Sequence, residues 1–167
     1  MLVQWTNVAL EDSTREVFSR DCPQFEVQTP SSTIIHVLVN HFKSRSGGGG
    51  PKRLRQAKAV RDIADHLVAD EQHVVVLGDL NEGPKTLNGT VENFADLYEA
   101  SSLLIDCYSL AQFDVGPRLG TFDSCGIRNP LDYIFISQSL TPALLSGTVF
   151  RKGLWGKRKT RPDNWET

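Results

Sequence analysis

The sequence lacks the long hydrophobic stretch that a membrane helix requires. Such a helix needs roughly 18 consecutive apolar residues, whereas the longest aliphatic stretches here are Ile34 to Val39 and Val74 to Leu77. The first residues, MLVQWTNVALEDS, contain neither a basic segment nor a sustained apolar segment, so no secretory signal is visible. These absences exclude a membrane span. They do not decide whether the protein is cytoplasmic or, if it is processed, extracellular.

Cysteine is also scarce. Cys22, Cys107 and Cys125 are too few and too scattered for a disulfide framework, and we expect small buried thiols with at most one bridge. The histidines show no HExxH motif and no Cys/His spacing typical of zinc sites. They are His36, His41, His66 and His73. A structural zinc site is therefore excluded.

The composition is that of an ordinary globular protein. The chain has 167 residues, of which 40% are hydrophobic and 23% charged, with a formal net charge of −2. About 150 residues per domain is the usual expectation, and this charge and apolar content disfavour disorder. We expect residues 1–167 to form one domain.

The charges are segregated along the chain. Seven of the 18 cations lie between residues 43 and 61 and six between 151 and 161, while 11 of the 20 acids lie between residues 70 and 132. This segregation fits cationic rims that attract an anionic substrate around carboxylates that hold a metal. A solvated helix face and a basic tail would give the same pattern.

One strand–helix–strand unit is clear in the pattern. Residues 33–40 are apolar and β-branched, as in a buried strand, and the glycine-rich HFKSRSGGGGP that follows is a loop. Apolar residues recur at helical spacing over 52–70, and 73–77 form a second buried strand. Two strands joined in this way are expected to be parallel neighbours, with functional loops at their carboxyl ends.

The later segments are less regular. Residues 93–104 have a helical pattern, residues 120–122 and 131–137 are expected to be strands, and residues 153–167 to be an exposed loop or tail.

Polar side chains follow both strands of the unit. Asp79 and Asn81, in GDLN, offer a carboxylate and an amide oxygen at close range, which suits Mg²⁺ or Mn²⁺. The same residues are also common in turns. His41 follows the first strand and could equally cap it, and Asp132 could cap the turn before its own strand.

Three motifs together, NHFKS, GDLN and LDYIF, resemble the endonuclease/exonuclease/phosphatase superfamily of metal-dependent, DNase I-like phosphodiesterases. FSRDCPQFEV, VLVNHFKS and VFRKGLWG are similar to a bacterial branch of it. The resemblance implies an α/β fold, part of a four-layer sandwich with mixed β-sheets flanked by helices. It also implies metal-dependent hydrolysis of phosphodiester or phosphomonoester bonds by in-line attack of water, with Mg²⁺ or Mn²⁺ as cofactor.

The resemblance also implies roles for individual residues. Asp79 would orient or deprotonate the attacking water, and Asn81 would hold the phosphate or the metal, with Asp79 and Asn81 as the metal ligands. His41 would donate a hydrogen bond to a phosphate oxygen, and Asp132 would orient a partner histidine. Further contacts to phosphate are expected from Lys43 and, more weakly, from Arg118 and Arg128.

The sequence departs from the superfamily at both ends. No counterpart of its N-terminal Asn and metal-binding Glu precedes Thr33, and no Ser-Asp-His stretch closes the chain. We therefore expect the C-terminal half of a domain that is incomplete at both ends and exposes a sheet edge and an apolar face. Its partners would be a nucleic acid or another phosphoester substrate, and the missing half or a second chain.

Two alternatives remain from the sequence. The chain could bind nucleic acid or another polyanion without catalysis, with affinity that falls steeply with salt, or it could be a structural fragment that needs another chain. The sequence does not choose among DNA, RNA, a lipid head group and a small phosphoester.

Overall fold

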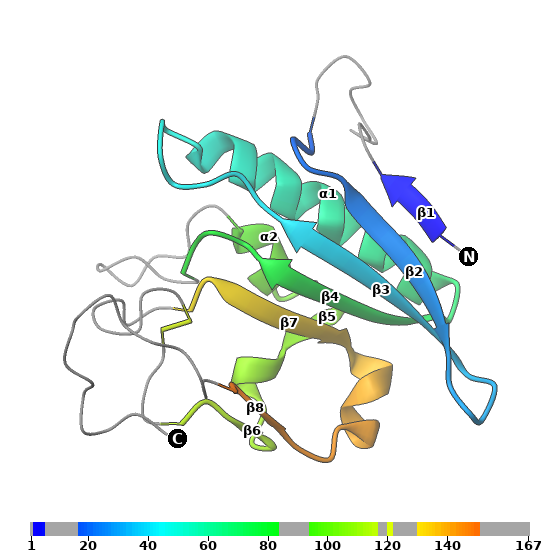
Figure 1. Cartoon of the computed structure of the whole chain (residues 1–167). Coiled ribbons are helices and arrows are strands. Elements are labelled where there is room, and N and C mark those ends of the chain that lie inside the picture. The colour runs from blue at the N-terminus through cyan, green and yellow to red at the C-terminus, as the bar shows by residue number, and fades with distance from the viewer. Residues whose placement is uncertain (1, 6–16, 84–93, 117–119, 122–129, 151–167) are drawn as a thin grey trace.

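A six-stranded mixed sheet forms the centre of the molecule (Figure 1). The structure, a computed structural model, describes residues 2–5, 17–83, 94–116, 120–121 and 130–150. The strand order is β1-β2-β3-β4-β7-β5. The strands are β1 (Leu2–Trp5), β2 (Cys22–Gln28), β3 (Ile34–His41), β4 (His73–Asp79), β7 (Asp132–Ser137) and β5 (Leu104–Asp106).

The predicted strand–helix–strand unit is confirmed as β3, α1 and β4. Helix α1 spans Gly50–Ala69, with a proline in its first turn, where a missing N–H costs no helical hydrogen bond. Strands β3 and β4 are parallel, in register from Ile35 with His73 to His41 with Asp79. Their carboxyl ends therefore meet at one rim of the sheet.

Strand β7 runs antiparallel to β4 and pairs Asp132 with Asp79. Because the two strands run in opposite directions, the beginning of β7 lies beside the end of β4. This direction explains how a residue at the start of one strand reaches the rim formed by the ends of two others.

The hydrophobic core lies between the sheet and the helices (Figure 1). Leu38, Val76 and Phe135 point from neighbouring strands into one cluster with Val60 of α1, and all four are fully buried. The short helix α2 (Ala95–Tyr98) and Phe94 just before it close the β7 side of this cluster, through ring contacts of Phe94 with Tyr133 and of Tyr98 with Phe135. The side chains that alternate with these core residues along each strand face the other way.

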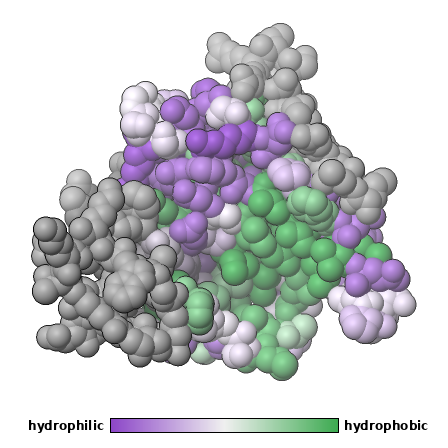
Figure 2. All heavy atoms as spheres, in the orientation of Figure 1, coloured by the Kyte–Doolittle hydropathy of each residue, from purple (hydrophilic) through white to green (hydrophobic). Residues whose placement is uncertain are grey.

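That opposite face of the sheet is apolar and partly exposed. Phe25, Val27 and Ile134 are exposed to 42%, 47% and 38%. By register, rows of apolar residues run between them across β2, β3, β4 and β7. Figure 2 shows this hydrophobic face as a continuous green area beneath a hydrophilic region. We call this surface, formed by Phe25, Val27, Ile35, Val37, Val39, Val75, Leu77 and Ile134, the apolar face.

Two expected elements differ from the structure. The helix predicted over 93–104 is wrong beyond the four residues of α2, and Leu104 begins a strand instead. The hydroxyl of Ser102 accepts a hydrogen bond from the Leu104 amide (3.2 Å), a local bond that competes with helix continuation. Gly120 and Thr121 belong to no strand, and Phe122 lies outside the described residues.

The remaining elements are short. They are two 3-10 segments, η1 (Cys107–Ser109) and η2 (Gln138–Ala143), and two paired strands, β6 (Phe113–Asp114) and β8 (Gly147–Thr148). Among the described residues, no helix is long and apolar enough to cross a membrane.

Candidate functional site

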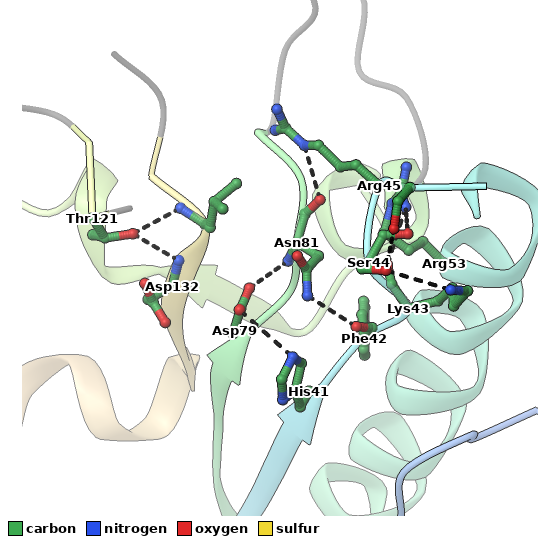
Figure 3. A network of polar contacts seen from close by, with 12 residues as sticks. His41, Phe42, Lys43, Ser44, Arg45, Arg53, Asp79, Asn81, Thr121 and Asp132 are labelled. Atoms are coloured by element: carbon green, nitrogen blue, oxygen red, sulfur yellow. Dashed lines mark hydrogen bonds and ion pairs between the residues drawn. The ribbon is translucent and has the colours of Figure 1, made fainter. Parts of the chain in front are cut away.

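Three of the predicted site residues lie side by side at the rim. His41, Asp79 and Asp132 are register partners on β3, β4 and β7, so their side chains project from the same face of the sheet. The His41 Nε2 atom lies 3.7 Å from Asp79 Oδ2 (Figure 3). One imidazole and two carboxylates therefore form a row, which we call the rim row.

Asn81 occupies the turn that follows Asp79. Its backbone N–H donates to Asp79 Oδ1 (2.8 Å), and its side-chain Nδ2 donates to the Phe42 carbonyl (3.0 Å). Its φ of 56° is left-handed, a conformation that asparagine tolerates better than most residues. The turn interpretation of GDLN is thus correct, and it is compatible with chemistry because Asp79 Oδ2 faces His41 and the Asn81 amide oxygen can act as a ligand.

Gly78 allows β4 to approach β3 closely just before this turn. Its φ is +135°, and a Cβ atom there would lie 1.9 Å from the carbonyl oxygen of Asn40. No side chain fits in that space. The glycine of GDLN is therefore required by the backbone that presents Asp79.

The loop after β3 is held by hydrogen bonds along its backbone. Phe42 is fully buried and its N–H donates to the Asp79 carbonyl (2.9 Å). The Lys43 N–H donates to Oε1 of Gln56 in α1 (2.9 Å), and Lys43 Nζ donates to Ser44 Oγ (3.4 Å). Lys43 thus lies on the α1 side of the loop, next to the rim row rather than within it (Figure 3).

Thr121 and Arg45 help to hold the backbone at the rim row, and the sequence did not predict either role. Thr121 Oγ1 accepts hydrogen bonds from the N–H groups of Leu131 (2.9 Å) and Asp132 (3.1 Å), which fixes the start of β7. Arg45 Nε donates to the Asn81 carbonyl (3.0 Å). Neither contact has a local sequence signal, because its partners are 10 or more residues apart in the chain.

The rim carries oxygen donors of the type that Mg²⁺ prefers. Mg²⁺ takes one or two carboxylates and keeps water or substrate oxygens in its other positions. Asp79, Asp132 and the Asn81 amide oxygen offer such a set. Among the described residues, no group of three or more His, Cys, Asp or Glu side chains is placed to hold a metal ion.

A cavity of about 220 Å³ adjoins Asp132. Its wall includes the aromatic residues Tyr108, Phe113, Tyr133 and Phe150. Cys107 also lines it, and burial raises the pKa of this thiol to about 11, so the thiol is neutral near pH 7. Arg118, Arg128 and Cys125 lie outside the described residues.

Solved structures share this fold. The catalytic domain of human Nocturnin, solved with a bound sulfate, is 20% identical over 83% of this chain and 47% of its own, with a TM-score of 0.58. A mannosyl-6-phosphatase of Bacteroides thetaiotaomicron is 14% identical over 71% of this chain and 43% of its own (TM-score 0.55). D. rerio TDP2, complexed with a single-strand DNA product, is 14% identical over 82% of this chain and 52% of its own (TM-score 0.55).

These likenesses, at such low identity, show the fold, which is mixed α/β and DNase I-like. The chain spans about half the length of these proteins. Among curated proteins, no sequence matches the chain. A sequence profile described as the Endonuclease/Exonuclease/phosphatase family, however, matches residues 4–151. The chain therefore belongs to the endonuclease/exonuclease/phosphatase family.

Proposed function

We propose that this chain supplies part of the active site of a metal-dependent phosphoester hydrolase. Nucleases and phosphatases, the activities in the family's name, both hydrolyse phosphoester bonds. The observation that supports the proposal most directly is the rim row, which places one imidazole and two carboxylates on a single face at the sheet rim. In-line hydrolysis requires a positioned water, a donor to the phosphate oxygens and neutralisation of their charge.

The geometry suggests a division of roles. Asp79 Oδ2 would orient the attacking water and accept its proton, because Oδ1 is engaged by the Asn81 amide. His41, whose Nε2 lies 3.7 Å from Asp79 Oδ2, would donate from its ring to a non-bridging phosphate oxygen. Asp132 would orient a histidine that another segment or chain supplies, since all four histidines of this sequence lie among the described residues.

Asp79 and the amide oxygen of Asn81 would hold Mg²⁺ or Mn²⁺, with Asp132 beside them. When bound, the cation would supply Lewis-acid charge neutralisation at the phosphate. Asn81 suits this role because its Nδ2 bond to Phe42 fixes the direction of its amide oxygen.

The active protein would need a second layer over the apolar face. The polar rim row lies two residues beyond the apolar row Val39–Leu77–Ile134 on the same face, so a layer packed there would also border the site. This chain covers only 47% and 43% of two of the solved proteins that share its fold. We propose a complementary half-domain with an apolar sheet face as the occupant, because two sheets packed face to face bury such surfaces.

The first experiment measures metal binding, since it does not require a complete active site. Paramagnetic Mn²⁺ should broaden the amide NMR signals near residues 41, 79 and 132, and Asp79→Asn should remove this broadening. Asp62→Asn, at a partly exposed ion pair on α1, is the matched control and should leave it unchanged. Broadening that is equal in both variants, or absent from the rim in the wild type, would contradict the proposal.

The second experiment measures turnover. Hydrolysis of a generic phosphodiester should require Mg²⁺ or Mn²⁺ and fall by about 100-fold or more in Asp79→Ala and His41→Ala, as expected for loss of a proton-transfer group. Binding of single-stranded DNA that weakens steeply with salt, without metal-dependent turnover, would favour a non-catalytic polyanion binder instead.

A further inference from the structure

Arg53, on α1, is a buried cation with an unusually complete set of partners. Its side chain is 6% exposed, and its Nη2 lies 2.6 Å from Glu82 Oε2, to which Nε also donates (2.8 Å). Its Nη1 donates to the carbonyls of Lys43 and Ser44, each at 3.0 Å. A buried guanidinium is tolerated only with such compensation, since an unpaired charge in the interior is very costly.

These contacts connect two loops that are far apart in the sequence. Lys43 and Ser44 follow His41 after β3, whereas Glu82 follows Asp79 and Asn81 after β4. Arg53 reaches both from the helix between them, as Figure 3 shows for the β3 loop. Arg53 thereby adds to the bonds from Phe42, Asn81 and Arg45 that hold the segment carrying His41 against the segment carrying Asp79.

The surroundings leave Arg53 little freedom to move. A Cβ atom on Gly49 would lie 3.0 Å from Arg53 Nη1 and 2.5 Å from the Ser44 carbonyl, so the glycine makes room for the contact. Gln56, one turn further along α1, accepts a hydrogen bond from the Lys43 N–H. Both backbone polar groups of Lys43 are thus bound by α1, the carbonyl by Arg53 and the N–H by Gln56. Both guanidinium nitrogens that face Glu82 reach the same oxygen, Oε2, and charge-assisted bonds of this kind are stronger than neutral ones.

We infer that Arg53 is a positioning residue for the rim row and that it acts through Glu82 and the Lys43–Ser44 backbone. The inference rests on the proposed function for its catalytic consequence. It also predicts loop order, which can be measured without any activity. Arg53 is not a catalytic residue, because its guanidinium is buried beneath the loops and directed at protein groups.

Arg61 provides a matched control on the same helix. Its side chain is also buried (9% exposed), pairs with Asp65, and donates to the carbonyls of Asp96 and Ser101 at 2.6 Å each. Its partners lie on the α2 side, away from the loops of the rim row. Arg61→Met therefore removes a comparable buried guanidinium without touching those loops.

The experiment compares Arg53→Met, Arg53→Lys and Arg61→Met by thermal unfolding and by amide hydrogen exchange of the full chain. Both methionine variants should unfold at lower temperature. Only Arg53→Met should speed exchange at residues 43–45 and 81, by about tenfold or more, the effect of losing one or two hydrogen bonds. Arg53→Lys should recover part of the protection because it keeps the charge but loses the fork.

In a turnover assay, Arg53→Met should lower kcat by about tenfold or more while KM changes little. The reason is that misplaced rim-row side chains slow the chemical step more than they weaken substrate binding. Equal exchange in Arg53→Met and Arg61→Met would overturn the inference. If exchange rises in Arg53→Met alone but wild-type protein shows neither Mn²⁺ binding nor turnover, the proposed function fails and the loop positioning stands.

Discussion

Asp106 is a buried carboxyl group that lies between two tyrosines. Its Oδ2 accepts from the Tyr98 hydroxyl and its Oδ1 from the Tyr108 N–H (2.9 Å), so both oxygens have donors. Desolvation by burial nevertheless raises the pKa of Asp106 above its usual range, since these hydrogen bonds offset the effect only in part. The carboxylate charge is thus a cost to the folded state near neutral pH.

The pH dependence of stability follows from the direction of this shift. Because its pKa is higher in the folded state, Asp106 binds its proton more tightly in the folded protein than in the unfolded one. Its contribution to folding stability is therefore full below the pKa of the unfolded state. That contribution is lost as the pH rises through the pKa of the folded state. We expect Asp106→Asn to flatten the fall in unfolding free energy from about pH 4 upward, where an unperturbed Asp ionises. Urea unfolding at several pH values measures this change.

The asparagine can still accept the Tyr108 N–H, so the variant should fold and keep the cap of η1. A pH profile that is identical in Asp106→Asn and the wild type would show that Asp106 does not make the expected contribution.

At the scale of the element, the end of β4 depends on one glycine. Gly78→Ala would place a methyl group against the Asn40 carbonyl, 1.9 Å away, in addition to the strain of a positive φ. We expect a loss of more than about 2 kcal/mol of unfolding free energy, the size typical of backbone strain with a steric clash. Denaturant unfolding of the two proteins provides the comparison.

Gly47→Ala is a control that has the backbone strain of a positive φ without the steric clash. Gly47 also has a positive φ (+71°), but a Cβ there would meet nothing within 4 Å. This control should cost only about 1 kcal/mol, the conformational cost of Ala in place of Gly. Equal losses in both variants would mean that the close approach of β4 to β3 is not essential.

The same element scale shows how far a sequence predicts this fold. The β3–α1–β4 unit was predictable because its apolar period is regular and its strands are continuous runs of buried residues. Strand β2 was missed, since Pro23 and Glu26 interrupt its alternation and its pairing with β1 and β3 defines it. The helix predicted after residue 93 was wrong because a local Ser102 bond outweighed a weak helical period.

Part of the candidate site was also predictable from the sequence, and part was not. That His41, Asp79 and Asp132 meet was predictable, because strand ends in an α/β sheet converge and the motifs mark them. Arg53 was not predictable, since its partners lie 9, 10 and 29 residues away and only the packing of α1 beneath the loops brings them together. The chemical roles of the rim residues stay predictions.

At the scale of the whole molecule, the two sides of the sheet differ sharply. Helix α1 covers one side, while among the described residues no element shields the exposed parts of the apolar face (Figure 2). Exposed apolar surfaces of this extent are typical of interaction sites. The half-domain proposed above would cover them.

Phe25 and Leu54 make a test of this idea possible, because their exposure is almost the same, 42% and 43%, on opposite sides of the molecule. Phe25 lies on the apolar face, and Leu54 lies on α1. Phe25→Glu should reduce binding of a hydrophobic dye and self-association in sedimentation, since a charge on an apolar surface disfavours its burial. Leu54→Glu should change neither. Equal effects of the two substitutions would show that the apolar face has no special tendency to be covered, and the requirement for a second layer over the rim row would lose its support.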